Sequence, residues 1–384
     1  MSDVAPVSQS RRIVRDTCTS IARTLADHIP LYVCALVFCS VTLAITSAYH
    51  IQLEASAGLF FLGMVGEFVF LGFAVFAIFE FVALVRSGFP DSPLLIMAKR
   101  MGARLMVGDR PGNIFHSLIV LTPLMVSFAA MKDQIPHIHP FAWDQTFARW
   151  DRVLGGGRMP WEILQRYLAQ PWITGGLNLV YDTWFLLMFC VLFSQTFAAR
   201  SSVLRMQFLL AFSFAWFIAG NLLAAVFSSA GPCFYGLLLH GPDPYAAQMA
   251  YLHAVTAHWP SWSASMQDTS VQALLWKSYI SRNGSLGGIS AMPSMHVTSS
   301  VLMMLVAWRI DRRLGIGFLI FTVLIVIGSI HLAWHYAVDG IAGIVLAALF
   351  WVAAGAIVRA NKRLTAGFRI PRTAAPTFQT HPVR

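Results

Sequence analysis

The chain has 384 residues, of which 57% are hydrophobic and only 11% are charged, and its net charge is +10. A soluble domain is typically about 25% charged, so this chain has too little polar surface to cover itself in water. The composition excludes an ordinary soluble domain and predicts a polytopic membrane protein. The basic residues lie between apolar segments rather than in one patch, so they indicate membrane orientation, and we expect no nucleic-acid partner.

Eight apolar segments are long enough, or nearly so, to cross ~30 Å of hydrocarbon as helices. They are residues 31–49, 58–85, 114–131, 172–198, 206–229, 294–310, 314–331 and 337–358. The first is longer than the hydrophobic region of a signal peptide, so we interpret it as an uncleaved anchor. The pattern therefore predicts an all-α, polytopic membrane helical bundle with about eight transmembrane helices.

Most Lys and Arg residues fall on the side of the membrane that holds the N-terminus, including those of the basic tail after residue 358. By the positive-inside rule both termini are expected in the cytoplasm, in an inner or plasma membrane. Two long stretches then face the other side. Residues 132–171 carry several Trp residues and predict one or two short amphipathic helices in the interface. Residues 230–292 are rich in Pro, Gly and aromatic residues, and so long a loop is uncommon unless it is functional.

The first stretch that contains candidate catalytic or binding residues is Pro293-Ser294-Met295-His296, which leads into a transmembrane segment. Proline suits the first turn of a helix because the missing N–H costs nothing there. Helix N-termini present free N–H groups and a partial positive charge, which suit phosphate. Ser294 is therefore a candidate phosphate ligand, and His296 is a candidate acid or base.

The second stretch is His331-Leu332-Ala333-Trp334-His335-Tyr336-Ala337-Val338-Asp339, between the last two transmembrane segments. If it is helical, His335 and Asp339 are neighbours on one face. Asp339 could then accept the N–H of one ring nitrogen and leave the other free to attack phosphorus. The charge distribution places both stretches at the non-cytoplasmic face. For His331 we leave two alternatives open, a phosphate ligand or partner and an interfacial residue.

Two other classes of function remain as alternatives. The side chains of His296, His331, His335 and Asp339 could bind a metal, since these residue types suit zinc. A transporter could use Glu67, Asp182 and Asn221 inside the spans, although the sequence lacks the internal repeats of many transporters. We favour the enzyme and expect neither a metal nor another cofactor.

The two stretches resemble the P-S-x-H and H-x-x-x-D motifs of the type 2 phosphatidic acid phosphatase superfamily. The H-Y-x-x-D form resembles the inositol-phosphorylceramide synthase-like, or inositolphosphotransferase, branch, as do Trp150-Asp151-Arg152 and Tyr181-Asp182 more weakly. The resemblance implies a six-helix core, here residues 114–358. Two extra transmembrane helices and a basic loop (31–113) precede it, with a cytoplasmic tail at each end (1–30 and 359–384).

The resemblance also implies a mechanism on a lipid phosphate. His335 would be the nucleophile that forms a phospho-histidine, Asp339 would orient it, and His296 would protonate the leaving alcohol. The acceptor would be an alcohol such as inositol, or water in a plain lipid phosphate or polyprenyl diphosphate phosphatase. No metal is required.

The sequence departs from the family in its basic residues. Many family phosphatases carry K-x6-R-P before P-S-x-H, and an Arg six residues before the second His, where this chain has Ser329. Arg110-Pro111 falls on the predicted cytoplasmic side. We therefore expect Arg282, and less strongly Lys277, to bind the phosphate, since Arg is the better bidentate partner.

Overall fold

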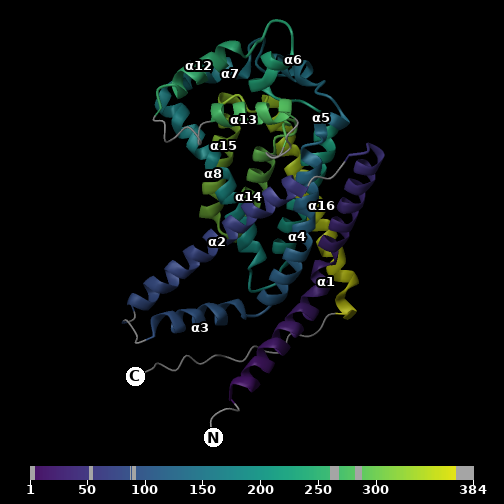
Figure 1. Cartoon of the computed structure of the whole chain (residues 1–384), viewed down its shortest axis with the longest axis vertical. Coiled ribbons are helices and arrows are strands. Elements are labelled where there is room, and N and C mark those ends of the chain that lie inside the picture. The colour runs from purple at the N-terminus through teal and green to yellow at the C-terminus, as the bar shows by residue number, and fades with distance from the viewer. Residues whose placement is uncertain are drawn as a thin grey trace.

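The structure is a computed structural model, which describes residues 5–51, 55–86, 88, 92–259, 268–281 and 288–368. Every regular element in those ranges is helical. Most of the longer helices run roughly along one axis and form a bundle, which α2 crosses at a slant (Figure 1). The predicted all-α membrane bundle is confirmed.

All eight apolar segments lie in helices. They correspond to α1 (Ala5–Ala48), α2 (Ala55–Arg86), α4 (Arg110–Lys132), α8 (Pro171–Thr196), α9 (Val203–Phe214) with its π-helical continuation η1 (Ala215–Leu223) and α10 (Ala224–Val226), α14 (Met295–Ile310), α15 (Arg312–His331) and α16 (Ala337–Leu364). Among the described residues, six helices are long and apolar enough to cross a membrane, and α14 is a shorter apolar helix.

The helix that contains the first apolar segment begins well before that segment. The predicted boundary between an N-terminal tail and the first span falls at residue 30, which lies inside α1, and Pro30 is accommodated within the helix. Apolar length alone locates the part that lipid can cover, whereas the polar residues before it continue the same helix. The polar turns of α1 are buried against the start of α4, where the Gly112 N–H donates to the Ser20 hydroxyl (3.1 Å).

The bundle closes around small residues on α16. A side chain on Gly343 would lie 2.9 Å from the Ser294 carbonyl oxygen, so α16 passes close to the start of α14. Ala347 and Ala354 are fully buried further along the same helix. Close approach through small residues is the usual basis of helix association in membranes, because van der Waals packing replaces the hydrophobic effect there.

Short helices gather at one end of the bundle, which we call the histidine face because His296 and His335 lie there. They are α5 (Ile135–Ile138), α6 (Asp144–Leu154), α7 (Pro160–Leu168), α11 (Tyr235–Leu238), α12 (Ala246–Thr256) and α13 (Asp268–Ser281), with the 3-10 turn η2 (Pro232–Phe234). Figure 1 shows α6, α7 and α12 above the ends of the long helices, with α13 beneath them. The amphipathic helices predicted in 132–171 correspond to α6 and α7.

The opposite end, which we call the terminal face, holds the start of α4 and α9 and the end of α16. The first turns of α1 and the helix α3 (Pro93–Leu105) lie on this side in Figure 1, and the 3-10 turn η4 (Ala366–Phe368) follows α16. The two faces are thus separated by the length of the bundle.

Candidate functional site

Three turns interlace at the histidine face: one after α10, one before α14 and one between α15 and α16. The Ala291 N–H donates to the Ser229 carbonyl (2.9 Å) and joins the first two turns. The Cys233 N–H donates to the Ala333 carbonyl (3.0 Å) and joins the first to the third. Gly231 has φ 105°, and a Cβ there would lie 2.8 Å from a carbonyl oxygen of the third turn. Only glycine fits this crossing.

His335 lies in the third turn, just outside α16. Asp339 lies in the first turn of that helix, and its Oδ2 is 3.4 Å from His335 Nδ1 and accepts the Tyr336 N–H at 3.0 Å. The Ser329 carbonyl accepts the His335 N–H at 3.0 Å, which fixes the backbone of the turn. The stretch is not continuously helical, because α15 ends at His331 and α16 begins only at Ala337. The expected pairing of His335 with Asp339 nevertheless forms.

The second imidazole lies beside the first. The ring centroids of His296 and His335 are 5.8 Å apart, with the planes at 62°. Burial lowers the pKa of His335 to about 3, a hydrogen bond to the backbone of Ala291 opposes this, and the charge of Lys132 lowers the pKa further. His335 is therefore neutral at physiological pH, the state in which an imidazole nitrogen carries a free lone pair.

Two aromatic residues of α8 hold the ring of His296. Tyr181 stacks on it with a centroid distance of 4.3 Å, and Trp184 packs against it at 4.1 Å. The Trp184 indole N–H donates to the Ser299 hydroxyl (2.8 Å), so the indole itself is fixed to α14. The imidazole is held in one orientation toward His335 by packing rather than by a carboxylate.

Lys132, the last residue of α4, brings a positive charge to the two histidines. Its charge acts on both imidazoles, and its Nζ donates to the Gly220 carbonyl at 3.4 Å. A Cβ on Gly288 would lie 2.5 Å from the Lys132 carbonyl oxygen, so the turn before α14 passes directly over the end of α4. Sequence reasoning had not assigned this lysine to the site.

A carboxylate of α6 holds two of the three turns together. Asp144 accepts the N–H groups of Ala230 and Gly231 (3.0 and 2.9 Å) and the hydroxyl of Tyr336 (2.8 Å). Burial raises the pKa of Asp144, and these donors oppose the rise. The carboxylate therefore compensates backbone and side-chain donors that would otherwise be buried without acceptors.

A second carboxylate of α6, two turns later, caps α16. Asp151 Oδ2 accepts the Ala337 N–H at 2.9 Å and its Oδ1 accepts the Val338 N–H at 3.0 Å. Burial raises the pKa of Asp151 to about 7, the two N–H groups oppose this, and the charge of Asp339 raises it further. Asp151 thus fixes the helix turn that carries Asp339.

The remaining predicted ligands have different positions. Ser294 is fully buried as the N-cap of α14, where its hydroxyl accepts the Val297 N–H at 3.4 Å. His331 is buried, and its Nε2 is 3.0 Å from the Thr174 hydroxyl oxygen. Lys277 is exposed on α13. Arg282 lies outside the described residues.

Three buried polar atoms have no hydrogen-bond partner among the residues that the structure describes: the hydroxyl of Tyr181, which stacks on His296, and Asp268 Oδ2 and Gln272 Oε1 on α13. The other oxygen of Asp268 accepts the Trp334 indole N–H at 2.6 Å, and the Trp334 ring is parallel to that of Tyr181. Burial raises the pKa of Asp268 to about 8, the Trp334 bond opposes this, and the charge of Asp182 adds to the rise. Buried polar atoms are normally paired, so these atoms indicate a ligand or ordered water.

Two histidines and an aspartate from separate turns thus meet at one end of a helical bundle. The model of one family, described as the PAP2 superfamily, matches residues 145–353, which is more than half of the chain. The chain belongs to the PAP2 superfamily. Neither the curated proteins nor the solved structures contain a match to it. Membership in the PAP2 superfamily supports a phosphatase or phosphotransferase that acts on lipid phosphates.

The PAP2 match begins after α4 and therefore leaves out Lys132. The sequence nevertheless carries a signal for it, because Lys132 is followed by six residues and then His139-Pro140. This is the K-x6-R-P spacing with histidine in place of arginine. The substitution hides the motif from a search for paired basic residues, and the structure identifies the lysine by its position.

The metal-site alternative has no support in the described part of the chain, where no group of three or more His, Cys, Asp or Glu side chains is arranged to hold a metal ion. The aromatic rings of Tyr181 and Trp184 pack directly against His296.

Replacement of Asp151 tests its role as a cap for α16. The Asp151→Ala change leaves two backbone N–H groups without acceptors, which costs about 1–3 kcal/mol of stability. We expect a lower thermal unfolding temperature in detergent and a loss of turnover, because Asp339 loses its fixed position. Glu162→Ala is the matched control, since Glu162 caps only its own helix α7. Equal turnover of the two variants would contradict the role given to Asp151.

Proposed function

We propose that this protein transfers phosphoryl groups from lipid phosphate esters through a phospho-histidine at His335. The observation that carries the proposal is the placement of a neutral, carboxylate-paired His335 beside His296, with ring centroids 5.8 Å apart. This arrangement supplies a nucleophile and an acid–base group at one phosphorus atom. The lysine, the start of α14 and the PAP2 membership all support a phosphate ester as the substrate.

In the first half-reaction, Asp339 holds the Nδ1–H of His335 and leaves Nε2 free to attack phosphorus. A P–N bond forms as the P–O bond to the leaving alcohol breaks. His296 donates its proton to the departing oxygen, so the alcohol leaves neutral. Geometry rather than a metal would orient the two imidazoles, because packing against Tyr181 and Trp184 fixes the second ring.

In the second half-reaction, His296 removes a proton from the acceptor hydroxyl. The acceptor oxygen attacks phosphorus, the P–N bond breaks, and His335 returns to its neutral form. His296 ends the cycle protonated, ready for the next leaving group. The same residue thus acts as acid and then as base.

Replacement of the two histidines separates these roles. We expect His335→Ala to abolish both turnover and acid-labile labelling by a 32P-labelled lipid phosphate. His296→Ala should slow turnover about 10²- to 10⁴-fold, the usual contribution of acid–base catalysis. Single-turnover labelling of detergent-purified protein measures both effects. His253→Ala, an exposed histidine on α12, is the matched control. Wild-type labelling of the His335→Ala protein would refute the proposal.

Lys132 is proposed to neutralise the phosphate, in place of the basic residues that the motifs lack. Its charge already acts on both imidazoles, and a phosphate between them would lie within the same field. Lys132 is half-buried, and such a cation interacts more strongly with an anion than an exposed one, because the surroundings screen the charge less. The exposed position of Lys277 makes it the weaker candidate.

The Lys132→Gln change tests this assignment against Lys277→Gln. Loss of a charge-assisted hydrogen bond costs about 1.5–3 kcal/mol, so we expect kcat/KM to fall about 10- to 100-fold for Lys132→Gln. Lys277→Gln should remain near wild type. Steady-state phosphate release from a short-chain lipid phosphate measures both. The reverse order of the two variants would assign the phosphate to Lys277.

The acceptor is proposed to be an alcohol with several hydroxyl groups, as in the inositol-phosphorylceramide synthase-like branch. Among the described residues, the polar atoms without a hydrogen-bond partner include the hydroxyl of Tyr181, whose ring stacks on His296, and atoms of Asp268 and Gln272, which bond with their other polar atoms to Trp334 and Leu332. Hydroxyl groups can both donate to and accept from such atoms. Water can fill the same positions, so a plain lipid phosphate or polyprenyl diphosphate phosphatase is the second candidate.

Partition of the phosphoryl group distinguishes the two candidates. With a labelled lipid phosphate, we expect added myo-inositol to divert label from inorganic phosphate to a polyol phosphate. Tyr181→Phe removes one hydroxyl but keeps the ring on His296, so the ratio of transfer to hydrolysis should fall about 2- to 10-fold. Tyr279→Phe on α13 is the control. Label that stays in inorganic phosphate with every polyol tested would favour the phosphatase.

The site is proposed to face the non-cytoplasmic side of an inner or plasma membrane. The support is the charge distribution of the sequence, which assigns the terminal face, with its basic residues, to the cytoplasm. Substrate lipids would then present their phosphate to the histidine face from the outer leaflet.

A further inference from the structure

Two short helices of the histidine face, α12 and α13, each bury an amide side chain. On α12, Gln248 is fully buried and shares one face with Leu252 and Val255, which lie four and seven residues further along. On α13, Gln272 is buried one turn after Asp268. A buried amide is unfavourable unless it is hydrogen-bonded, so each glutamine needs partners inside the protein.

Both amides donate to the backbone where α15 ends. Gln248 Nε2 donates to the carbonyls of Ile330 (2.7 Å) and His331 (3.1 Å). Gln272 Nε2 donates to the carbonyl of Leu332 (3.0 Å), the first residue of the third turn. The last carbonyls of a helix have no partner within it, so the two glutamines supply donors that α15 lacks. The amide oxygens of both side chains have no hydrogen-bond partner among the residues that the structure describes, so donation to this backbone is the polar contact that compensates their burial.

Further groups hold the rest of the third turn. Asp268 Oδ1 accepts the indole N–H of Trp334 at 2.6 Å. The N–H of Cys233 in η2 donates to the Ala333 carbonyl at 3.0 Å. The last two residues of α15 and the three that follow are thus each bonded to α12, α13 or η2. The next residue along the chain is His335, so these bonds determine where its backbone lies.

The third turn has a backbone conformation that requires such support. Ala333 has φ 61°, in the left-handed region that residues with a Cβ rarely adopt. The Ser329 carbonyl accepts the N–H groups of both Trp334 and His335 (3.0 Å each), so the chain reverses tightly over the end of α15. A residue in that region persists where the surrounding structure fixes it. Loss of the outside donors would let the turn relax and carry His335 away from His296.

We propose that Gln248 and Gln272 are positioning residues for phosphoryl transfer, which hold the third turn so that His335 lies beside His296. They act on the carbonyl groups before His335, whereas Asp151 acts on the N–H groups after it. Gln248 provides the cleaner test, because Gln272 also carries an oxygen that is proposed to bind the acceptor. The inference rests on the role proposed for His335 as the nucleophile.

Gln248→Met tests the proposal, because it keeps the length of the side chain and removes the donor. We expect the single-turnover rate of His335 labelling by a 32P-labelled lipid phosphate to fall about 10- to 100-fold, since a displacement of about 1 Å has effects of this size. KM should change little, because the substrate contacts remain. Gln207→Met is the matched control. The Gln207 amide on α9 also donates to a backbone carbonyl, that of Trp351 on α16 (2.9 Å), and this variant should be labelled at the wild-type rate.

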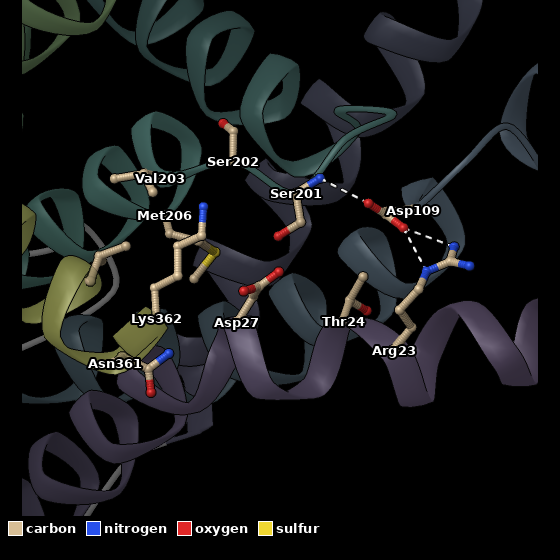
Figure 2. Close-up of a pocket in the computed structure, with 11 residues that line it drawn as sticks. Arg23, Thr24, Asp27, Asp109, Ser201, Ser202, Val203, Met206, Asn361 and Lys362 are labelled. Carbon is tan, nitrogen blue, oxygen red and sulfur yellow. Dashed lines mark hydrogen bonds and ion pairs between the residues drawn. The ribbon is translucent and has the colours of Figure 1, made fainter. Parts of the chain in front are cut away.

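A second control separates positioning from a general loss of stability. At the terminal face, Asp109 links Arg23 of α1 (2.8 Å) to the Ser201 N–H before α9 (3.3 Å), as Figure 2 shows. Asp109→Asn weakens this junction at the other end of the bundle. It should lower the thermal unfolding temperature without slowing the labelling of folded protein. Equal slowing in Gln248→Met and Asp109→Asn, at a matched loss of unfolding temperature, would overturn the positioning role.

Hydrogen exchange provides a readout that does not depend on activity. Peptides that cover residues 330–336 should exchange faster in Gln248→Met than in Gln207→Met, and equal exchange in the two variants would contradict the proposal. A wild-type protein that acquires no label would refute the proposed function instead. The exchange experiment would still decide whether Gln248 holds the turn.

Gln248→Glu provides a variant of the same shape where Gln248→Met does not fold. A buried carboxyl group favours its neutral form, which can donate one hydrogen bond to the turn. The ratio of its labelling rate to that of the wild type should therefore fall as the pH rises and the group ionises. Division by the wild-type rate removes the titration of groups that both proteins share. A ratio that stays constant from about pH 5 to about pH 9 would count against the proposal.

Discussion

The site depends on how a membrane protein satisfies the polar groups of non-helical backbone. A helix pairs its own N–H and C=O groups, but the three turns that form the site cannot, and an unpaired buried group costs several kcal/mol in an apolar environment. Buried carboxylates of α6 supply the missing acceptors. Asp144 binds the turn after α10 and the Tyr336 hydroxyl, and Asp151 binds the first N–H groups of α16. The catalytic geometry is thus a consequence of hydrogen-bond compensation, and α6 is a structural part of the site.

The same constraint explains the different surroundings of the two histidines. His335 lies in a turn, where Asp339 and the Ser329 carbonyl hold it through hydrogen bonds. His296 lies in the first turn of α14, and aromatic rings of α8 hold its side chain instead. One imidazole is therefore polarised by a carboxylate and the other is only packed. This asymmetry suits one for attack on phosphorus and the other for proton transfer.

Sequence patterns predicted the elements of the fold well because membrane helices are defined by apolar length. They located all eight long helices and the pairing of His335 with Asp339, whereas the helical turns of α1 that precede the apolar segment at residue 31 gave no such signal. Polar turns that pack on other helices carry no apolar signal. Lys132 was missed for a related reason: its partner position holds His139, so the basic pair that marks the motif is absent. The roles of Asp144 and Asp151 were also invisible, because they bind backbone far away in the chain.

Many family phosphatases carry several basic residues in their motifs, whereas this site is proposed to rely on a single lysine. This difference affects how the site can select its substrate and acceptor. A site with several arginines can bind any phosphate strongly through charge alone. Here one lysine and a helix start are proposed to supply the positive potential, so the rest of the selectivity must come from neutral contacts. Unpartnered atoms of Tyr181, Asp268 and Gln272 are placed to provide them. Such a site attracts anions only weakly, and directional hydrogen bonds decide which acceptor binds. A polyol acceptor is favoured over water because its hydroxyl groups, held in fixed positions, can pair with buried polar atoms that bulk solvent reaches only with difficulty.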